Sequence, residues 1–191
     1  QDKEVVAQFA KLGIGPGLTF DPAALTAAQR AGLQRAVETA YQRVMLHSQE
    51  NGEIRNGWRF ATNLGAYGNN RMLASAIGLM GYGANRAEEA LYLPAFLDHE
   101  NQPLVSKRNY RIHFTADNLP PVNEFWSITL YSRPENQLKD NPINRYAFGD
   151  RTPTLQRNAD GSIDIYVQQE RPEGDKAANW LPSGESGPIW M

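Results

Sequence analysis

The hydrophobic period of the chain changes near residue 90, and this change limits the possible folds more than any other feature. Before it, large apolar residues recur at near-helical spacing, as Leu33, Val37 and Tyr41 do. After it, residues 110–115 and 163–167 alternate apolar and polar side chains, as strands do. We therefore expect an α+β chain with a helical segment over 1–90 and an antiparallel β-domain over 91–191.

Two helices are expected in the first part. Thr26 and Gln29 have the spacing of a capping box that begins a helix, and Asn51 with the glycine after it ends that helix. A second, more apolar helix is predicted over 71–80, before Gly81. Asn85 with Glu88 could cap one further short turn through Leu91. We expect this turn and the helix over 71–80 to be buried.

The strands of the second part carry different signals. Residues 125–131 have bulky side chains on both faces, which is typical of a central strand covered on both sides. Asp160 and Gly161 form a turn sequence that predicts a β-hairpin, with its second strand over 163–167. The polar stretch 133–153 is predicted to be a loop, and its length makes it a candidate for function.

Composition excludes several classes of function. Cysteine is absent, so thiol catalysis, disulfides and cysteine-ligated metal centres are excluded. The net charge of −2 gives no reason to expect nucleic acid or an anionic membrane as partner. No apolar run approaches the roughly 20 residues that span a bilayer. No two histidines have the spacing of metal ligands, and we expect neither a metal nor a cofactor.

Four motifs follow one another in the second part of the chain. They are NLPPVNEFWSITLY over 118–131, DNPINRYAFGDRTP over 140–153, NADGS over 158–162 and NWLP over 179–182. Together they resemble the C-terminal domain catalogued as domain of unknown function 1214, and the resemblance covers roughly residues 81–190. In that family the domain commonly follows a partner catalogued as domain of unknown function 1254, which this chain lacks.

The resemblance implies an antiparallel β-sandwich or jelly-roll-like domain with no settled activity, often found in exported bacterial proteins. It implies a periplasmic or secreted location, with the cytoplasm as the alternative, and the N-terminal domain of the same protein as a partner. Relatives usually continue beyond Trp190 through another strand. Gln1 is expected to follow either a signal peptide or an interdomain cut.

Catalytic groups are sparse. His113 could activate a nucleophile only if Ser127 or Thr129 lay beside it, and no nucleophile-elbow motif flanks either hydroxyl. We interpret His113 as a surface or hydrogen-bonded strand residue. Carboxylates are scattered through the second part, and the sequence selects no pair for glycoside hydrolysis.

The densest group of planar hydrogen-bond donors lies between residues 140 and 152. Such side chains could bind a carboxylate or a sugar-like ligand, with Trp180 as an accessible stacking surface, whereas Trp126 is interpreted as core. The alternative is that amides and Arg–Asp pairs only hold the loop in place. The candidate ligand-binding residues are Asn141, Asn144, Arg145, Tyr146, Asp150, Arg151 and Trp180.

Three functions follow from these observations. In the first, the domain binds a small molecule or glycan at this loop and forms a homo-oligomer. In the second, it is part of a hydrolase whose site lies at the junction with the missing N-terminal domain. In the third, it is a purely structural assembly domain. We prefer binding or assembly to catalysis, because no catalytic constellation is evident in the sequence.

Overall fold

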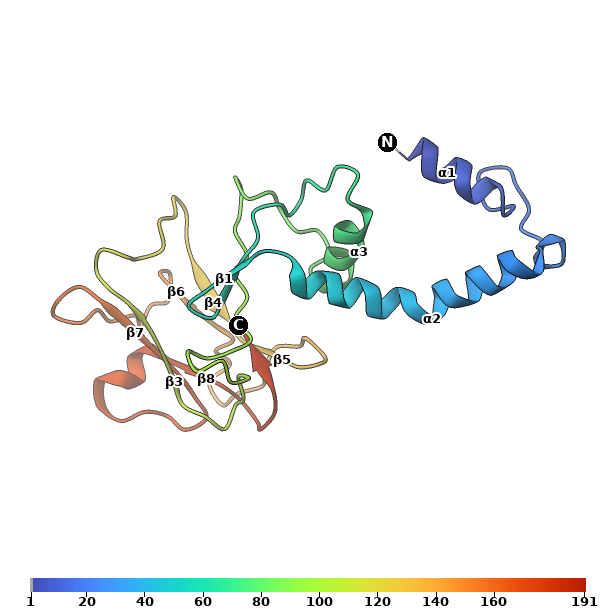
Figure 1. Cartoon of the computed structure of the whole chain (residues 1–191). Helices are drawn as coiled ribbons and strands as arrows, with labels where there is room; N and C mark the ends of the chain where they lie inside the picture. Colours follow the sequence, from blue (N-terminus) through green and yellow to red (C-terminus); the bar gives the residue numbers. More distant parts are fainter. Residues whose placement is uncertain (1) are drawn as a thin grey trace. The chain divides into compact units, whose positions relative to one another are not determined.

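The chain forms two units in the computed structural model, which describes residues 2–191 (Figure 1). Unit 1 holds the residues up to Glu53 together with Ala61–Tyr92, and unit 2 holds Ile54–Phe60 and Leu93–Met191. Unit 2 therefore includes Ile54–Phe60, which the sequence assigned to the helical segment. The expectation concerning Gln1 lies outside the described residues.

Unit 1 is helical. Its elements are α1 (Lys3–Ala10), the 3₁₀ helix η1 (Pro22–Ala24), α2 (Ala27–Glu50) and α3 (Arg71–Met80). The capping box is present, because the Thr26 hydroxyl accepts from the N–H of Gln29 and the Gln29 side chain accepts from the N–H of Thr26. The Asn70 side chain caps α3, which ends before Gly81. Both predicted helices are confirmed.

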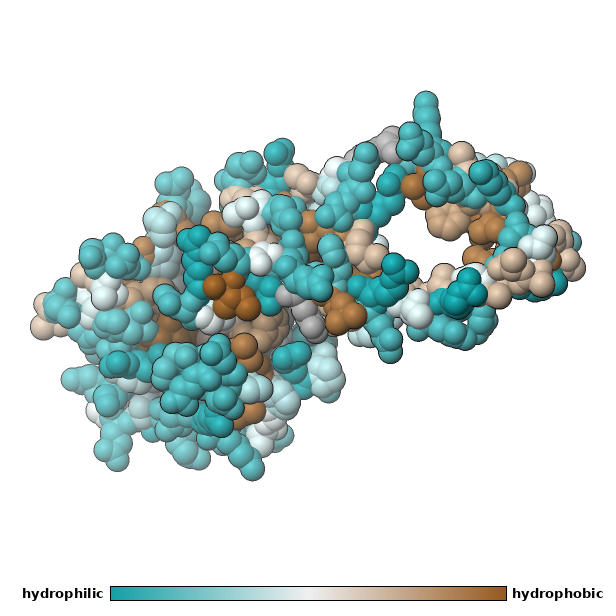
Figure 2. Space-filling model, viewed as in Figure 1, coloured by the Kyte–Doolittle hydropathy of each residue, from teal (hydrophilic) through white to brown (hydrophobic). Residues whose placement is uncertain are grey.

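Residues 85–91 form a turn and no helix, and Leu91 is 52% exposed, so their predicted burial is wrong. Much of α2 is also exposed. Val37 and Tyr41 on this helix are 79% and 64% exposed, and apolar side chains remain at the surface of the helical region in Figure 2. α3, which packs against α2, has 10 residues and cannot cover a helix of 24. α3 itself buries Leu73 and Ala76. Among the described helices, none combines the length and apolarity needed to cross a bilayer.

Unit 2 consists of small sheets. The strands are β1 (Glu53–Arg55) paired with β2 (Trp58–Phe60), β4 (Ser127–Thr129) with β6 (Ala147–Gly149), β5 (Tyr131–Ser132) with β9 (Ile189–Trp190), and a sheet of β3 (Tyr110–Phe114), β7 (Ile163–Gln168) and β8 (Trp180–Pro182) in that order. The β3–β7 pair is antiparallel and the β7–β8 pair is parallel. The α+β class is confirmed, whereas a jelly-roll sandwich is not.

The hydrophobic core of unit 2 draws side chains from most of these strands. Its buried members include Leu130, Phe148, Ile163, Ile165, Val167, Leu181 and Ile189. Phe148 on β6 has no exposed surface and is the largest fully buried side chain. Trp126 packs against the core, as expected, and contacts Phe114 with 5.4 Å between ring centroids.

The predicted β-hairpin at Asp160-Gly161 is wrong, although its turn exists. The N–H of Gly161 donates to the carbonyl of Asn158, and the N–H of Asn158 donates to that of Ser162. Gly161 takes a φ of 84°, which favours glycine. Residues 155–158 form no strand, because β7 pairs with β3 on one edge and β8 on the other.

The segment 125–131 does not form one central strand. It contains β4 and the first residue of β5, and within the described chain β4 pairs with β6 in a two-stranded sheet. Ile128 and Leu130 point into the core, but Phe125 is 53% exposed. The predicted loop 133–153 contains β6, which supplies the partner of β4.

Candidate functional site

Asn141 and Asn144 shape the loop that the sequence selected. The Asn141 side-chain carbonyl accepts from the N–H of Arg145, and its amide group donates to the carbonyls of Lys139 and Arg145. Asn144 has a φ of 50°, which asparagine tolerates, and its side chain accepts from the Tyr146 hydroxyl at 3.3 Å. Asn141 therefore stabilises the backbone of the loop, and Asn144 orients Tyr146.

Arg145 joins the loop to the segment before β8. Its Nη1 donates to the carbonyls of Ala178 and Trp180 at 3.3 and 2.8 Å, and its Nη2 donates to the Thr154 hydroxyl at 3.1 Å. The guanidinium also lies over the ring of Phe148, 5.7 Å from its centroid. Burial lowers the pKa of Arg145 from its ordinary value.

Asp150 and Arg151 hold the loop against the start of β4. Asp150 accepts from the N–H of Trp126 at 3.1 Å. Arg151 lies over the ring of Phe125, 4.7 Å from its centroid, and contacts both the carbonyl and the carboxylate of Glu124. Asp150 thus fixes backbone, while Arg151 covers an exposed aromatic ring.

Trp180 is not available for stacking. Its side chain is 4% exposed, and its indole N–H donates to the carbonyl of Gln168 at 2.9 Å. The expectation of an accessible Trp180 is therefore wrong, because Trp180 begins β8 and pairs with β7 in the sheet. Its ring belongs to the interior of unit 2.

An open hollow of about 560 Å³ lies beside the predicted loop, and we call it the loop hollow. Four of the seven candidate residues line it, namely Asn144, Arg145, Tyr146 and Arg151. Phe125 and Trp126 supply further aromatic lining. Gly149 lets β6 pass close to β4 here, since a Cβ at Gly149 would collide with the carbonyl oxygen of Trp126. The loop hollow therefore combines aromatic, amide and guanidinium groups, whereas Asn141, Asp150 and Trp180 do not line it.

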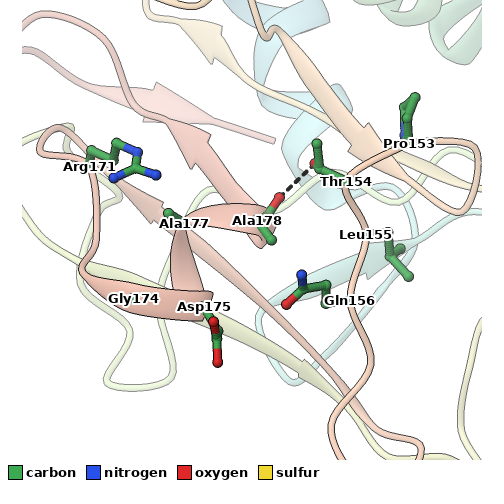
Figure 3. Close-up of a pocket in the computed structure, with 9 residues that line it drawn as sticks. All are labelled: Pro153, Thr154, Leu155, Gln156, Arg171, Gly174, Asp175, Ala177 and Ala178. Atoms are coloured by element: carbon green, nitrogen blue, oxygen red, sulfur yellow. Dashed lines mark hydrogen bonds between the residues drawn. The ribbon is translucent and has the colours of Figure 1, made fainter.

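A second open hollow of about 480 Å³ contains residues that the sequence did not select (Figure 3). Thr154 and Gln156 contribute to it, and Arg171 and Asp175 are its charged members. The Thr154 hydroxyl donates to the carbonyl of Ala178 at 2.7 Å, which is the dashed line in Figure 3. No sequence motif marked these residues, because they come from two separate stretches of irregular chain and the η2 helix (Gly174–Asn179).

His113 forms a dyad with a buried carboxylate. The two residues are direct partners on β3 and β7, and Nδ1 of His113 lies 2.8 Å from Oδ1 of Asp164. Asn158 donates to the other carboxylate oxygen at 2.9 Å, and Nε of Arg111 lies 3.7 Å from Oδ1. Within residues 2–191 no hydroxyl is hydrogen-bonded to His113, which fits its interpretation as a hydrogen-bonded strand residue.

The charge of Asp164 is stabilised by its neighbours. Burial raises the pKa of this carboxyl, but hydrogen bonds from His113 and Asn158 and the charge of Arg111 outweigh burial, so the pKa lies below its ordinary value of 3.8. The ionised form is therefore the one that folding favours. Across the described part of the chain, no three histidine or carboxylate side chains gather as a metal site would require.

An Asp164→Asn variant is expected to lose stability at neutral pH and less of it in acid. A depressed pKa contributes stability that is present above the ordinary value and is lost as pH falls through the folded-state pKa. The loss at pH 7 should be about 1–2 kcal/mol, the range for a hydrogen-bonded charge that keeps some solvent contact. Urea unfolding at several pH values checks this, and a difference that stays constant below pH 3.8 would contradict it.

The fold and hollow together define an α+β protein whose β-rich unit carries an open surface site. The chain belongs to the family described as protein of unknown function (DUF1214), whose family model matches residues 89–191. The resemblance drawn from the four motifs is therefore confirmed.

A solved structure shares the fold. It is the VPA0106 protein from Vibrio parahaemolyticus, which is 24% identical to this chain with a TM-score of 0.63. The alignment covers 99% of this chain and 45% of that one, so this chain spans less than half the length of its structural neighbour. None of the curated proteins matches this chain.

Proposed function

We propose that unit 2 binds a small molecule with a flat ring face, such as a sugar or an aromatic compound, in the loop hollow. The observation that supports this is the gathering of Phe125, Trp126 and Tyr146 around one hollow of about 560 Å³ beside Asn144. Ligand sites in proteins combine apolar and aromatic walls with a few polar groups that fix orientation. The loop hollow has this composition.

The aromatic groups differ in how firmly they are held. Trp126 is half-buried against the core and against Phe114, so its position is fixed before any ligand arrives. Tyr146 is tied to Asn144 through its hydroxyl. Phe125 is 53% exposed and can adjust to a ligand. A site with fixed walls loses little freedom on binding, which favours affinity.

The other two functions have less support. For a hydrolase, the His113–Asp164 dyad supplies an oriented imidazole, but the described residues give it no bonded hydroxyl. For an assembly domain, unit 1 exposes Val37, Tyr41 and Tyr82, and nothing among the described residues identifies what would cover them. Binding in the loop hollow is therefore the function that the geometry supports best.

Removing one aromatic wall is expected to weaken binding of neutral ring compounds. Tyr146→Ala and Phe125→Ala should each reduce the affinity for benzyl alcohol or methyl glucoside about fivefold, as loss of one stacking contact of about 1 kcal/mol would. Ligand-observed NMR titration of the full chain measures this. Tyr82→Ala is the matched control, because Tyr82 is 95% exposed on unit 1.

Two results would contradict the proposal. One is that no ring compound, neutral or charged, binds the wild-type chain at millimolar concentration. The other is that Tyr82→Ala weakens binding as much as Tyr146→Ala and Phe125→Ala do, since the probes would then be sensing exposed aromatic side chains in general.

A further inference from the structure

We propose that the ligand of the loop hollow is an anion, a ring compound that carries a carboxylate, such as an aromatic carboxylate or a uronic acid. This inference rests on the proposed function and adds the charge of the ligand to it. It is carried by Arg145 and Arg151, which are the charged residues among those that line the hollow.

The lining of the loop hollow has one sign of charge. Arg145 and Arg151 belong to it, and no aspartate or glutamate of the described chain does. Asp150, the nearest acidic residue in sequence, turns its carboxylate to the N–H of Trp126. A concave surface lined by positive charges concentrates anions and repels cations.

Among the described residues, Arg145 has no acidic partner. Its three hydrogen bonds go to two carbonyls and one hydroxyl, which are all neutral groups, and burial is the cause that lowers its pKa. A half-buried cation held only by neutral oxygens gains more from an arriving anion than an exposed cation does. A guanidinium has five N–H donors, so about two of them remain for a carboxylate, which guanidinium groups bind in a forked geometry.

The ion pair between Arg151 and Glu124 is weak. Its Nη2 lies 3.6 Å from the Glu124 carboxylate, and the two side chains are 65% and 85% exposed. Exposed pairs of this kind are screened by solvent and contribute little. Arg151 can therefore exchange Glu124 for a ligand carboxylate while its guanidinium remains over the ring of Phe125.

The test compares probes that differ in charge and share a ring. Benzoate is compared with benzyl alcohol and benzylamine, and glucuronate with glucose, by NMR titration of the full chain. We expect each carboxylate to bind at least about fivefold tighter than its neutral partner, the ratio that one charge-assisted hydrogen bond of about 1 kcal/mol gives. Raising the salt concentration should reduce this ratio.

Variants locate the effect. Arg151→Gln should weaken benzoate binding about three- to tenfold and change benzyl alcohol binding less than twofold, because only the charged probe uses the guanidinium. Arg145→Lys keeps a charge at the bridge to Ala178, and should lose most of the preference for benzoate because an ammonium cannot form the fork. Arg171→Gln, at the second hollow, is the matched control and should leave both probes unchanged.

The outcomes separate this inference from the proposed function. Equal binding of benzoate and benzyl alcohol, or a preference for benzylamine, overturns the inference and leaves the ring site standing. Failure of every probe to bind overturns both. Loss of benzoate binding in Arg171→Gln but not in Arg151→Gln also overturns the inference, because the anion would then lie in the second hollow. Since Arg151 is 65% exposed, its variant remains informative if Arg145→Lys fails to fold.

Discussion

Replacing Phe148 by alanine is expected to lower the free energy of unfolding of unit 2 by about 3–5 kcal/mol, the range for removal of a buried phenyl ring. Phe148 has no exposed surface and lies in the core that β6 shares with the other strands. The loss combines the transfer of the ring out of water with the cavity it leaves. The shape of the loop hollow should change with it, because Phe148 is also among the residues around that hollow.

Tryptophan fluorescence measures this change in unit 2 alone. The four tryptophans of the chain, Trp58, Trp126, Trp180 and Trp190, all belong to unit 2. Far-ultraviolet circular dichroism reports mainly the helices of unit 1. In urea, the fluorescence transition of Phe148→Ala should move to lower denaturant while the helical signal changes less.

The same substitution at Phe125 is the matched control. Phe125 is 53% exposed and is covered on one side by Arg151, so Phe125→Ala should cost less than about 1 kcal/mol. If both variants shift the fluorescence transition equally, the packing of β6 described above is wrong.

The helices could be predicted because their signals are local. The capping box of Thr26 and Gln29 acts over three residues, and the Asn70 cap and Gly81 bound α3 in the same way. Burial of α2 could not be predicted, because it depends on whether another element covers Val37 and Tyr41. Periodicity shows which face is apolar, and a partner decides whether that face is buried.

Strand pairing was less predictable than strand position. Residues 163–167 form β7 as expected, but the pairing of β7 with β3 and β8 joins segments far apart in the sequence. The Asp160-Gly161 turn favoured a hairpin between neighbouring segments. Both edges of β7 pair instead with β3 and β8. Turn chemistry fixes the bend of the chain, while the partners of a strand depend on the whole core.

The candidate site was also predicted only in part. The composition of residues 140–152 led to Asn144, Arg145, Tyr146 and Arg151, which line one hollow. The composition could not show that Asn141 only stabilises the loop backbone, because a side-chain amide can hydrogen-bond either to backbone or to a ligand. Burial of Trp180 follows from its position in β8, and the order of that sheet carries no local signal.

Asn179→Ala is expected to destabilise unit 2 by about 2–4 kcal/mol, because it removes the partner of one buried and two part-buried backbone groups. Asn179 is 6% exposed, and its amide group donates to the carbonyls of Gln156 and Asp164 at 2.7 and 2.9 Å. Its side-chain carbonyl accepts from the N–H of Gln156 at 2.8 Å. One side chain thus closes the chain before β7 onto β7 and the start of β8.

Asn179→Asp tests whether these bonds, and not the volume of the side chain, account for the loss. A carboxylate has the same shape but would place an oxygen against the carbonyls of Gln156 and Asp164, so this variant should be at least as unstable as Asn179→Ala. Asn118→Ala, at an exposed asparagine, should stay within about 0.5 kcal/mol of the wild type. Tryptophan fluorescence in urea compares all three. A wild-type transition in Asn179→Asp would show that the amide bonds contribute nothing, since the substitution keeps the packing and removes only the donors.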